Sequence, residues 1–547
     1  MGYLWLGPPS QKLMRFVAFI AAATAALAVG TPAAASPVFV IKGYGFGHGI
    51  GLGQYGAAGL ANNGSTYDQI LAHYYRGTTL GTVDSARIRV LVSAPEHAFV
   101  VASAVPFTLR GSGGNEVVLP GGSVTVSKKL VVTTGSEVHE LATPLTFVPG
   151  EAPLSVGSRS YRGRINVHDT ADGTLVVNDV PLEQYLYGVV PSEMPASWGV
   201  EALKAQAVAA RSYALATRRT SGVFDAYSDT RSQVYGGLAV EQPRTSDAVD
   251  ATSGQVVLHE GVVATTFFFS TSGGRTAAIE DVWRGASALP YLRSVEDPAD
   301  AHSPYHRWGP IVLSRKQLQR QLRTQGPRGI TDVTTTTNAS GRVDLFVMLG
   351  SRRQVAIDGA AARTALGLRS TGFAVGVLDL FKPQAAAKFR QKVAIQGIAR
   401  NVRSVTLELK TDGRWAHFRD VTPDAAGNVR VRVRPTRTSI FRLVSAAIRG
   451  SGVRAPRIKV LVGARATLER KRRGVFVGAM RPKQAGAPVR LERLGKRGWR
   501  RVARSTTSAT GKYRFRLRPR PAGEYRAVVT PHGGELVPGT SKIVSIG

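Results

Sequence analysis

The last third of this chain contains an internal repeat, which strongly limits the folds that this region can adopt. The segment VTLELKTDGRWAHFRD at residues 405–420 aligns with VRLERLGKRGWRRVAR at residues 489–504. One offset of 84 residues pairs Trp415 with Trp499, Gly427 with Gly511, Pro435 with Pro519, and Phe441 with Tyr525. Apolar and polar residues alternate in both copies, as in strands. The repeat therefore predicts two small β-sandwich-like modules, residues 388–460 and 461–547.

The positive charge of the chain is concentrated in these two modules. The whole chain has 71 Lys+Arg and 36 Asp+Glu residues, a formal net charge of +35, and residues 388–547 alone contain 38 basic and 8 acidic side chains. The sequences RVRVRP (430–435) and RFRLRP (514–519) place arginines on one strand face and apolar residues on the other. This charge favours a polyanionic partner; the alternative is a solvated strand face.

The first 35 residues have the features of a secretory signal. Lys12 and Arg15 precede an apolar run, and Ala33–Ala35 form a small-residue cleavage site before Ser36. The apolar run is shorter than the roughly 20 residues of a membrane span, although an uncleaved anchor is the alternative. We expect a secreted, cell-wall-associated protein that contacts anionic wall polymers and no nucleic acid.

The chain contains no cysteine, which excludes disulfides, thiolate metal sites and cysteine nucleophiles. His302 and His306 are near Pro304 in a predicted loop, without a zinc-binding helix motif. We therefore predict no metal site and no cofactor.

The middle of the chain is predicted to mix strands and helices. Short alternating runs separated by glycine-rich turns indicate a β-rich region over residues 87–180. Helices are expected at residues 65–75 and 195–218, and strands again at 256–270. The fold class is therefore α+β, rich in strands, followed by the two all-β modules.

The block LEQYLYGVVPSEMPASWGVEALKAQAVAARSYAL, residues 182–215, is the strongest candidate for a chemical site. We expect its VVP to end a strand, and a turn to place Glu193 before a helix that buries one alanine-rich face. Met194 and Trp198 are apolar neighbours in sequence. A carboxyl among apolar groups has its pKa raised, which suits a general acid. From the pattern alone, a surface glutamate favoured by the helix dipole remains the alternative.

This block resembles the signature of the SpoIID/LytB family. DTRSQVYGG (229–237), TSGQVVLHEGVVATTFFFSTSGGRTAAIEDVW (252–283), PYLRSVEDPAD (290–300) and DGAAARTALGLRSTGFAV (358–375) extend the resemblance over most of residues 40–376. It predicts a SpoIID/LytB-like domain at residues 36–383, after a signal peptide at residues 1–35.

A glycine-rich segment, GYGFGHGIGLGQYGAAGLANNGSTYDQILAHYYRGTTL at residues 43–80, is the second candidate. Its glycines permit positive φ and close approach of the backbone to a ligand, and His48 and Gln54 are the polar groups that it presents. The resembled family has a similar segment, usually at the C-terminal end of the domain, so its order here is permuted. Because domain termini are often close together, such a permutation is physically tolerable.

The resemblance implies a lytic transglycosylase that cleaves the MurNAc–GlcNAc bond of peptidoglycan glycan strands, with Glu193 as its single catalytic acid and base. Further substrate-binding candidates are Lys204, Gln206, Arg211, Tyr235, Ser272, His48 and Gln54.

A second interpretation is a non-catalytic enhancer or recruiter of a cell-wall amidase, anchored by the basic modules. In that case Glu193 is structural. A third is a protein that only anchors to the wall, which would leave the polar residues of the central block without a function.

Overall fold

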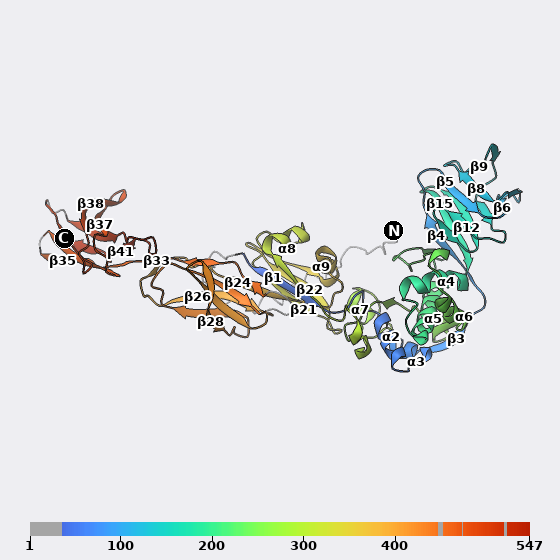
Figure 1. Ribbon diagram of the computed structural model, residues 1–547, viewed down its shortest axis with the longest axis horizontal. Coiled ribbons are helices and arrows are strands. Elements are labelled where there is room, and N and C mark those ends of the chain that lie inside the picture. The colour runs from blue at the N-terminus through green and yellow to red at the C-terminus, as the bar shows by residue number, and fades with distance from the viewer. Residues whose placement is uncertain (1–35, 447–451, 473, 519–521) are drawn as a thin grey trace. The chain divides into compact units, whose positions relative to one another are not determined.

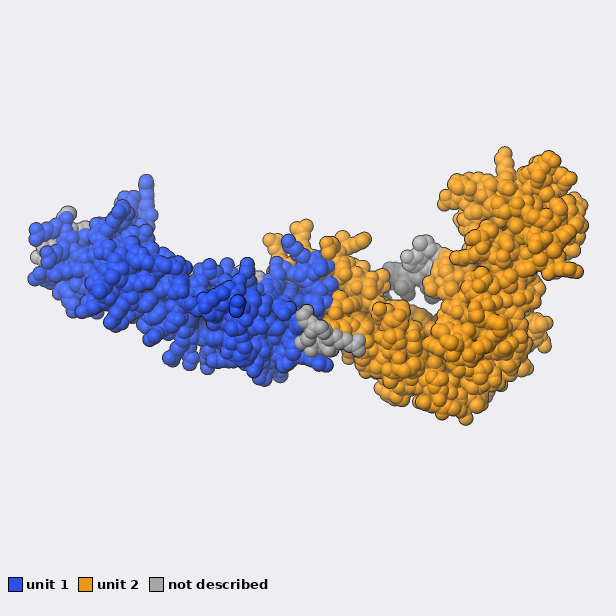
Figure 2. Space-filling model, viewed as in Figure 1, with its two compact units in different colours: residues 1–40, 312–317, 376–547 blue, residues 41–311, 318–375 orange. Residues whose placement is uncertain are grey.

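The computed structural model describes residues 36–446, 452–472, 474–518 and 522–547 (Figure 1). The predicted signal peptide, residues 1–35, lies outside the described residues. The chain divides into two compact units (Figure 2): residues 41–311 with 318–375, and residues 1–40 with 312–317 and 376–547. We call these the N-terminal and C-terminal units. In the described part of the chain, no helix is long and apolar enough to cross a membrane.

The predicted β-rich region forms most of two sheets in the N-terminal unit, which are antiparallel except for the parallel pairing of β16 with β4. One has the order β16-β4-β15-β14-β11-β6-β7 and the other β10-β9-β8-β5-β12-β13. Inward-facing side chains at alternate strand positions fill the core, for example Val90, Leu109, Phe147 and Val167, each 0% exposed. The strands are β4 (Arg87–Ser93), β5 (Phe99–Ser103), β6 (Phe107–Arg110), β7 (Glu116–Leu119), β8 (Gly122–Val126), β9 (Val132–Thr134), β10 (Glu137–His139), β11 (Leu145–Val148), β12 (Leu154–Val156), β13 (Arg159–Tyr161), β14 (Arg164–Thr170), β15 (Gly173–Pro181) and β16 (Ala226–Tyr227). The strand-rich prediction is confirmed.

The strand predicted at VVP is wrong, because these residues belong to helix α4 (Leu182–Glu193). Tyr185, Leu186 and Val189 recur at helical spacing and are buried in the core under the sheets. Pro191 lies in the last turn, where its missing N–H removes only one late helical bond. Glu193 therefore ends one helix and does not immediately precede the next.

Helix α5 (Val200–Thr217) confirms the helix expected at residues 195–218. The prediction was a helix with one buried face, but α5 is buried on two faces because its alanines belong to two hydrophobic cores. Ala207 and Ala210 pack with the sheets and α4, whereas Ala205 and Ala209 pack with Ile70 and other residues of the second core. Small side chains at these positions let both cores approach the helix closely. Helix α6 (Pro243–Asp250) packs beside α4 and α5 (Figure 1).

The glycine-rich segment forms strand β2 (Leu52–Gly53), helices α2 (Gln54–Asn62) and α3 (Tyr67–Tyr74), and strand β3 (Thr79–Thr82). Helix α3 confirms the prediction for residues 65–75, whereas α2 was not expected. Strand β2 pairs in parallel with β19 (Phe268–Phe269), and β3 pairs with β17 (Gln255–His259), which also pairs with β18 (Val262–Val263). These pairings join the start of the described chain to the segment that follows α6.

The rest of the N-terminal unit contains a three-stranded sheet of β21 (Asp332–Thr337), β22 (Val343–Leu349) and β23 (Gln354–Asp358). Helix α9 (Gly359–Leu366) follows β23 directly, and the short helix α7 (Ile279–Val282) comes earlier in the chain. The described 3-10 helices η2 (Leu238–Val240) and η3 (Pro298–His302) also belong to this unit, whereas helix α8 (Arg315–Leu322) spans a boundary between the units. The strands β1 (Val38–Gly43), β20 (Trp308–Ser314) and β24 (Phe373–Leu380) each span a boundary between the units.

The C-terminal unit contains the repeat, and both copies form the same strand order. In the first copy, β27 (Val405–Thr411) lies between β28 (Arg414–Val421) and β30 (Ser439–Ser445). In the second, β37 (Pro488–Gly495) lies between β38 (Gly498–Thr506) and β40 (Gly523–Val529). Each copy has its own buried core. The domain boundaries remain predictions.

The predicted alternation of arginines is confirmed on β29 (Asn428–Val433) and β39 (Lys512–Arg516). Their arginines are exposed and the apolar residues between them are buried. The remaining strands of this unit are β25 (Ala387–Lys388), β26 (Val393–Arg400), β31 (Val453–Arg454), β32 (Ile458–Val460), β33 (Val462–Gly463), β34 (Arg465–Ala466), β35 (Glu469–Arg472), β36 (Val475–Arg481), β41 (Gly539–Thr540) and β42 (Val544–Ile546).

Candidate functional site

A cavity of about 550 Å³ in the N-terminal unit contains the carboxylate of Glu193. Residues from distant parts of the chain line it: Phe46, Gly47, His48, Gln54, Glu193, Tyr213, Thr230, Arg231, Ser232, Phe267, Phe268, Phe269, Ser270, Trp283 and Arg363. Among these described lining residues, Glu193 is the one carboxylate. The site therefore combines a single acid, two arginines and a mainly aromatic wall.

Two donors hold the Glu193 carboxylate in place. The backbone N–H of Val234 donates to Oε1 at 3.2 Å, and the amide Nε2 of Gln54 donates to Oε2 at 3.4 Å. Gln54 is the first residue of α2, so the glycine-rich segment reaches the glutamate despite its permuted place in the chain. The structure thus brings together the two strongest candidates from the sequence.

Burial raises the pKa of Glu193, and the bonds from Val234 and Gln54 oppose that rise. Burial dominates because the side chain is half-buried against aromatic rings, whereas each opposing bond comes from a neutral donor. The direction agrees with the prediction. The apolar neighbours differ, because the rings of Tyr213 and of residues 267–269 line the cavity. Met194 instead lies in the second core, and Trp198 packs against Tyr55 with ring centroids 4.8 Å apart.

His48 lies in the same cavity as a neutral imidazole. Its Nδ1 accepts the backbone N–H of Ile50 at 3.0 Å, so the proton is on Nε2, which donates to the carbonyl of Phe268 at 3.0 Å. Burial, reinforced by the charge of Arg342, lowers the pKa of His48 to about 4. Because both ring nitrogens are already bonded, His48 positions the loop against the aromatic wall.

Two glycines allow the His48 loop to approach its neighbours this closely. Gly49 has φ +96°, and a Cβ there would lie 2.3 Å from the guanidinium of Arg342. Gly51 has φ +75°, and its Cβ would lie 2.1 Å from the carbonyl oxygen of Phe267. Other residues at these positions would force the loop away from β19 and from Glu193.

Gln206 and Lys204, both on α5, have different surroundings. Gln206 is fully buried, and its Oε1 lies 3.5 Å from the Nε2 of Gln54, so it supports the residue that holds Glu193. Lys204 forms an ion pair with Glu201 at 2.8 Å and lies 5.7 Å from the ring centroid of Tyr67. Neither residue lines the cavity.

The prediction of glycan contacts by Arg211, Tyr235 and Ser272 needs correction, because all three are buried away from the cavity. Arg211 is 0% exposed and pairs with Glu183 at 2.6 Å. Tyr235 donates to the side chain of Asn178 at 2.8 Å. Ser272 donates to Asp300 at 2.9 Å. These polar groups satisfy one another inside the fold, as buried polar groups generally must.

The histidines considered for a metal site have protein partners. His306 Nδ1 lies 2.6 Å from Asp300, and His302 Nδ1 lies 2.9 Å from the carbonyl of Ala299. Within the described ranges, no group of three His, Asp or Glu side chains is arranged to hold a metal ion.

Several lining residues were missed from the sequence. Arg363 supplies positive charge to the site, Arg231 lines it while paired with Asp229 at 2.7 Å, and Trp283 with the aromatic run 267–269 supplies its apolar wall. The run 267–269 was predicted only as a strand. Consecutive side chains of a strand point to opposite faces, so one buried face cannot cover three consecutive phenylalanines. That excess was the available signal for an apolar cavity wall.

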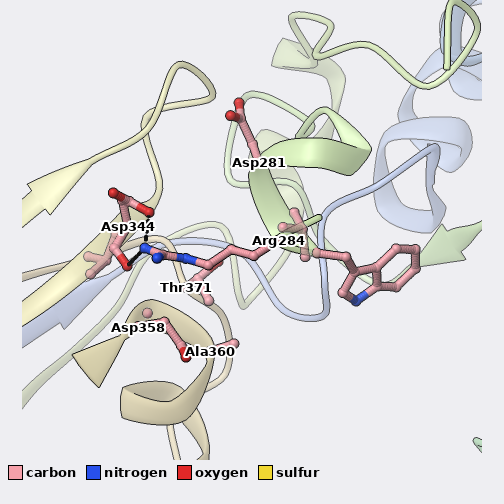
Figure 3. A pocket seen from close by; sticks show the side chains of 10 residues that line it. Asp281, Arg284, Asp344, Asp358, Ala360 and Thr371 are labelled. Carbon is pink, nitrogen blue, oxygen red and sulfur yellow. Dashed lines mark hydrogen bonds and ion pairs between the residues drawn. The ribbon is translucent and has the colours of Figure 1, made fainter. Parts of the chain in front are cut away.

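A second cavity, of about 270 Å³, shares Trp283 with the first. Its three aspartates are all engaged. Figure 3 shows Arg284 extended toward Asp344, with which it forms an ion pair. Asp281 accepts from Ser340 at 2.5 Å, and Asp358 caps α9 at 2.6 Å from the N–H of Ala361. Like Asp281 and Asp358, and unlike Asp344, Glu193 accepts its hydrogen bonds from neutral donors, Val234 and Gln54, which suits proton transfer.

Comparisons with known proteins point to one family. The family model "SpoIID: Stage II sporulation protein" matches residues 170–259. The Stage II sporulation protein D of Bacillus subtilis (strain 168) is 32% identical over 242 residues, covering 40% of this chain and 68% of that protein. The Amidase enhancer of the same organism is 43% identical over 133 residues, covering 24% of this chain and only 17% of that protein.

Among solved structures, a two-domain fibronectin type III segment of chicken tenascin covers 31% of this chain and 99% of its own, at 12% identity and a TM-score of 0.21. A likeness this weak supports no conclusion about the fold.

Proposed function

This chain belongs to the SpoIID family, and we propose that it acts on cell-wall peptidoglycan as a lytic transglycosylase with Glu193 as its acid and base. The observation that carries the proposal is the single carboxylate in an aromatic cavity, with its pKa raised by burial. Ordinary glycosidases need two carboxylates around the scissile bond. A cavity with one carboxylate suits a reaction in which the substrate supplies its own nucleophile.

In the proposed reaction, protonated Glu193 donates its proton to the glycosidic oxygen as the bond from MurNAc C1 to GlcNAc O4 breaks. The C6 hydroxyl of the same MurNAc attacks C1, and its proton passes to the Glu193 carboxylate. The products are a 1,6-anhydro end and a free GlcNAc hydroxyl, and no water is consumed. An intramolecular nucleophile gains a large effective concentration, so no second acid is required.

The other lining residues support the binding of a sugar chain. Aromatic rings at positions 213, 267–269 and 283 offer apolar surfaces for sugar-ring faces. Arg363 adds a guanidinium suited to the carboxylates of MurNAc substituents, whereas the guanidinium of Arg231 already forms a bidentate pair with Asp229. The hydrogen bond from Gln54 orients the Glu193 carboxylate and lowers its pKa.

The test is Glu193→Gln, which keeps the shape of the side chain and removes its proton chemistry. We expect the folded variant to release no anhydro-ended products from purified glycan strands, as measured by mass spectrometry. Glu151→Gln is the matched control, because Glu151 is exposed and does not line the cavity. Undiminished product release by Glu193→Gln would refute the catalytic assignment.

The second candidate is enhancement of a wall amidase, favoured by the 43% identity to the Amidase enhancer. The two candidates differ in one assay. If the chain only recruits or stimulates an amidase, the isolated protein releases nothing from glycan strands, and Glu193→Gln stimulates the amidase as well as the wild type does.

We also propose that the protein is exported, on the basis of the basic and apolar leader that ends at Ala35. N-terminal sequencing of protein recovered from the cell envelope would then begin at Ser36. Recovery of the protein only with an intact leader would contradict export by cleavage.

A further inference from the structure

The outer face of strands β37, β38 and β40, in the second repeat, holds arginines opposite one another. The strand register places Arg490 directly opposite Arg504, and Arg501 opposite Glu492. Like charges at opposite positions destabilise a sheet. Glu492 does not neutralise the group, because it already pairs with Arg526 at 2.9 Å and lies 3.7 Å from Arg490. Glu492 thus contacts two of the four arginines at positions 490, 501, 504 and 526.

Three of these arginines border a hollow. A depression of about 510 Å³ is lined by Arg490, Arg501 and Arg504 together with Pro488, Val489, Ser505, Thr506 and Thr530. It adjoins a second depression, of about 730 Å³, which also contains Ser505 and Thr506 and is bordered by Lys471, Lys512 and Arg514. The two depressions share Ser505 and Thr506, and the second also contains Glu469, which lies 3.7 Å from Lys471. Basic side chains outnumber acidic ones in both.

The first repeat shows that the fold does not require these arginines. At the 84-residue offset, Thr406 and Asp420 stand where the second repeat has Arg490 and Arg504, and the two bond at 3.0 Å. His417 stands in place of Arg501.

By contrast, the structural elements of this face are kept. Glu408 pairs with Arg442 at 2.7 Å, and the guanidinium of Arg442 lies 4.0 Å from the ring centroid of Trp415. In the second repeat, Arg526 likewise pairs with Glu492 and lies 4.2 Å from the ring centroid of Trp499. The two repeats therefore differ at the exposed arginine positions, and they share the ion pair and the cation–π contact that stabilise the fold.

We propose that this arginine face binds a polyol-phosphate polymer of the cell wall. A bound phosphate removes the repulsion between the opposed arginines. The oxygens of a phosphate point in tetrahedral directions, so they can accept hydrogen bonds from guanidinium groups on both strands. The two oxygens of a carboxylate are both used by a single bidentate arginine. The linked depressions admit successive charges of a linear chain. The inference rests on the proposed cell-wall function only for the choice of polymer.

Nucleic acid fits this face less well. Proteins that hold single strands stack bases on accessible aromatic rings. Arg526 covers the ring of Trp499, and Tyr513, which lines the second depression, is 4% exposed and donates its hydroxyl to the carbonyl of Thr467. The face therefore offers phosphate contacts without a platform for bases.

The test compares two triple variants of the full chain. R490Q/R501Q/R504Q removes the arginine face, and R430Q/R432Q/R434Q removes the same charge from exposed arginines of the first repeat. Binding of labelled poly(glycerol phosphate) is measured by fluorescence anisotropy over a salt series. We expect the first variant to bind at least about tenfold more weakly, and the magnitude of its slope of log K against log salt to fall by about 2. We expect the affinity of the control variant to fall by less than about threefold.

Folding and catalysis provide independent readouts. The thermal midpoint of R490Q/R501Q/R504Q should equal or exceed that of the wild type, because repulsion is relieved, and its release of anhydro ends from purified glycan strands should be unchanged. Loss of catalysis in Glu193→Gln with normal polymer binding keeps the two proposals separate. Equal loss of affinity in both triple variants, or tighter wild-type binding of polygalacturonate or of single-stranded DNA, would overturn the inference.

Discussion

Replacing Asp297 by Asn should stabilise the protein at neutral pH and have little effect in acid. Asp297 is 0% exposed, and it accepts a bond from the Tyr74 hydroxyl at 2.9 Å. It also lies against helix α2, where a Cβ at Gly56 would lie 2.3 Å from its Oδ1. Burial, together with the charge of Asp300, raises the pKa of Asp297 from 3.8 to about 6.

The sign and size follow from linkage between protonation and folding. The folded state holds the proton more tightly than the unfolded state, so this group lowers the free energy of unfolding as pH rises from about 4 to about 6. The difference of about two pKa units corresponds to about 3 kcal/mol once pH is above the folded pKa. Asn is neutral at every pH and still accepts the Tyr74 hydroxyl, so the variant avoids that loss.

The assay is urea unfolding of wild type and Asp297→Asn at about pH 3.5 and about pH 7.5. We expect near-equal unfolding free energies in acid and a variant that is more stable by about 3 kcal/mol at neutral pH. The difference between the two proteins isolates this residue from other titrating groups. A difference that does not change with pH, or a variant that becomes less stable as pH rises, would show that the carboxyl is not held protonated by burial.

Two further predictions concern Gln54, beside Glu193, and the buried pair of Arg211 with Glu183. Gln54→Ala removes a bond that lowers the pKa of Glu193, so the limb of the pH–rate profile set by Glu193 should move to higher pH; an unmoved limb would place Gln54 outside the catalytic machinery. Arg211→Met leaves Glu183 without its buried partner and should lower the free energy of unfolding by about 3–5 kcal/mol. Replacing Glu183 by Leu as well should recover most of that loss in urea unfolding, and a stable single variant would contradict the pairing argument.

The parts of the fold that were predicted correctly are those with local periodicity. Alternation specified the strands over residues 87–180, and helical spacing specified α3 and α5. The offset of 84 residues predicted a repeat whose paired tryptophans have equivalent arginine partners. In each case the pattern that buries one face is visible within a few residues of sequence.

The elements that were not predicted depend on tertiary context. Val189, Val190 and Pro191 favour a strand or a break by propensity, yet burial against the sheets makes them the end of α4. Helix α2 begins after four glycines with positive φ, which mask its start. Propensity is a weak prior when a long-range contact determines which face is buried.

The polar side chains of the site could not be separated from those of the interior by residue type. Arg211 and Ser272 occupy a sequence block as suggestive as that of Gln54, but their partners are Glu183 and Asp300, inside the fold. Gln54 differs because it directly follows strand β2, and the parallel pairing of β2 with β19 places its side chain beside Glu193. That pairing joins residues more than 200 positions apart, and it is independent of whether the glycine-rich segment precedes or follows the block that contains Glu193. The placement of Gln54 beside Glu193 therefore depends on this long-range strand pairing, with which a permuted chain order is compatible.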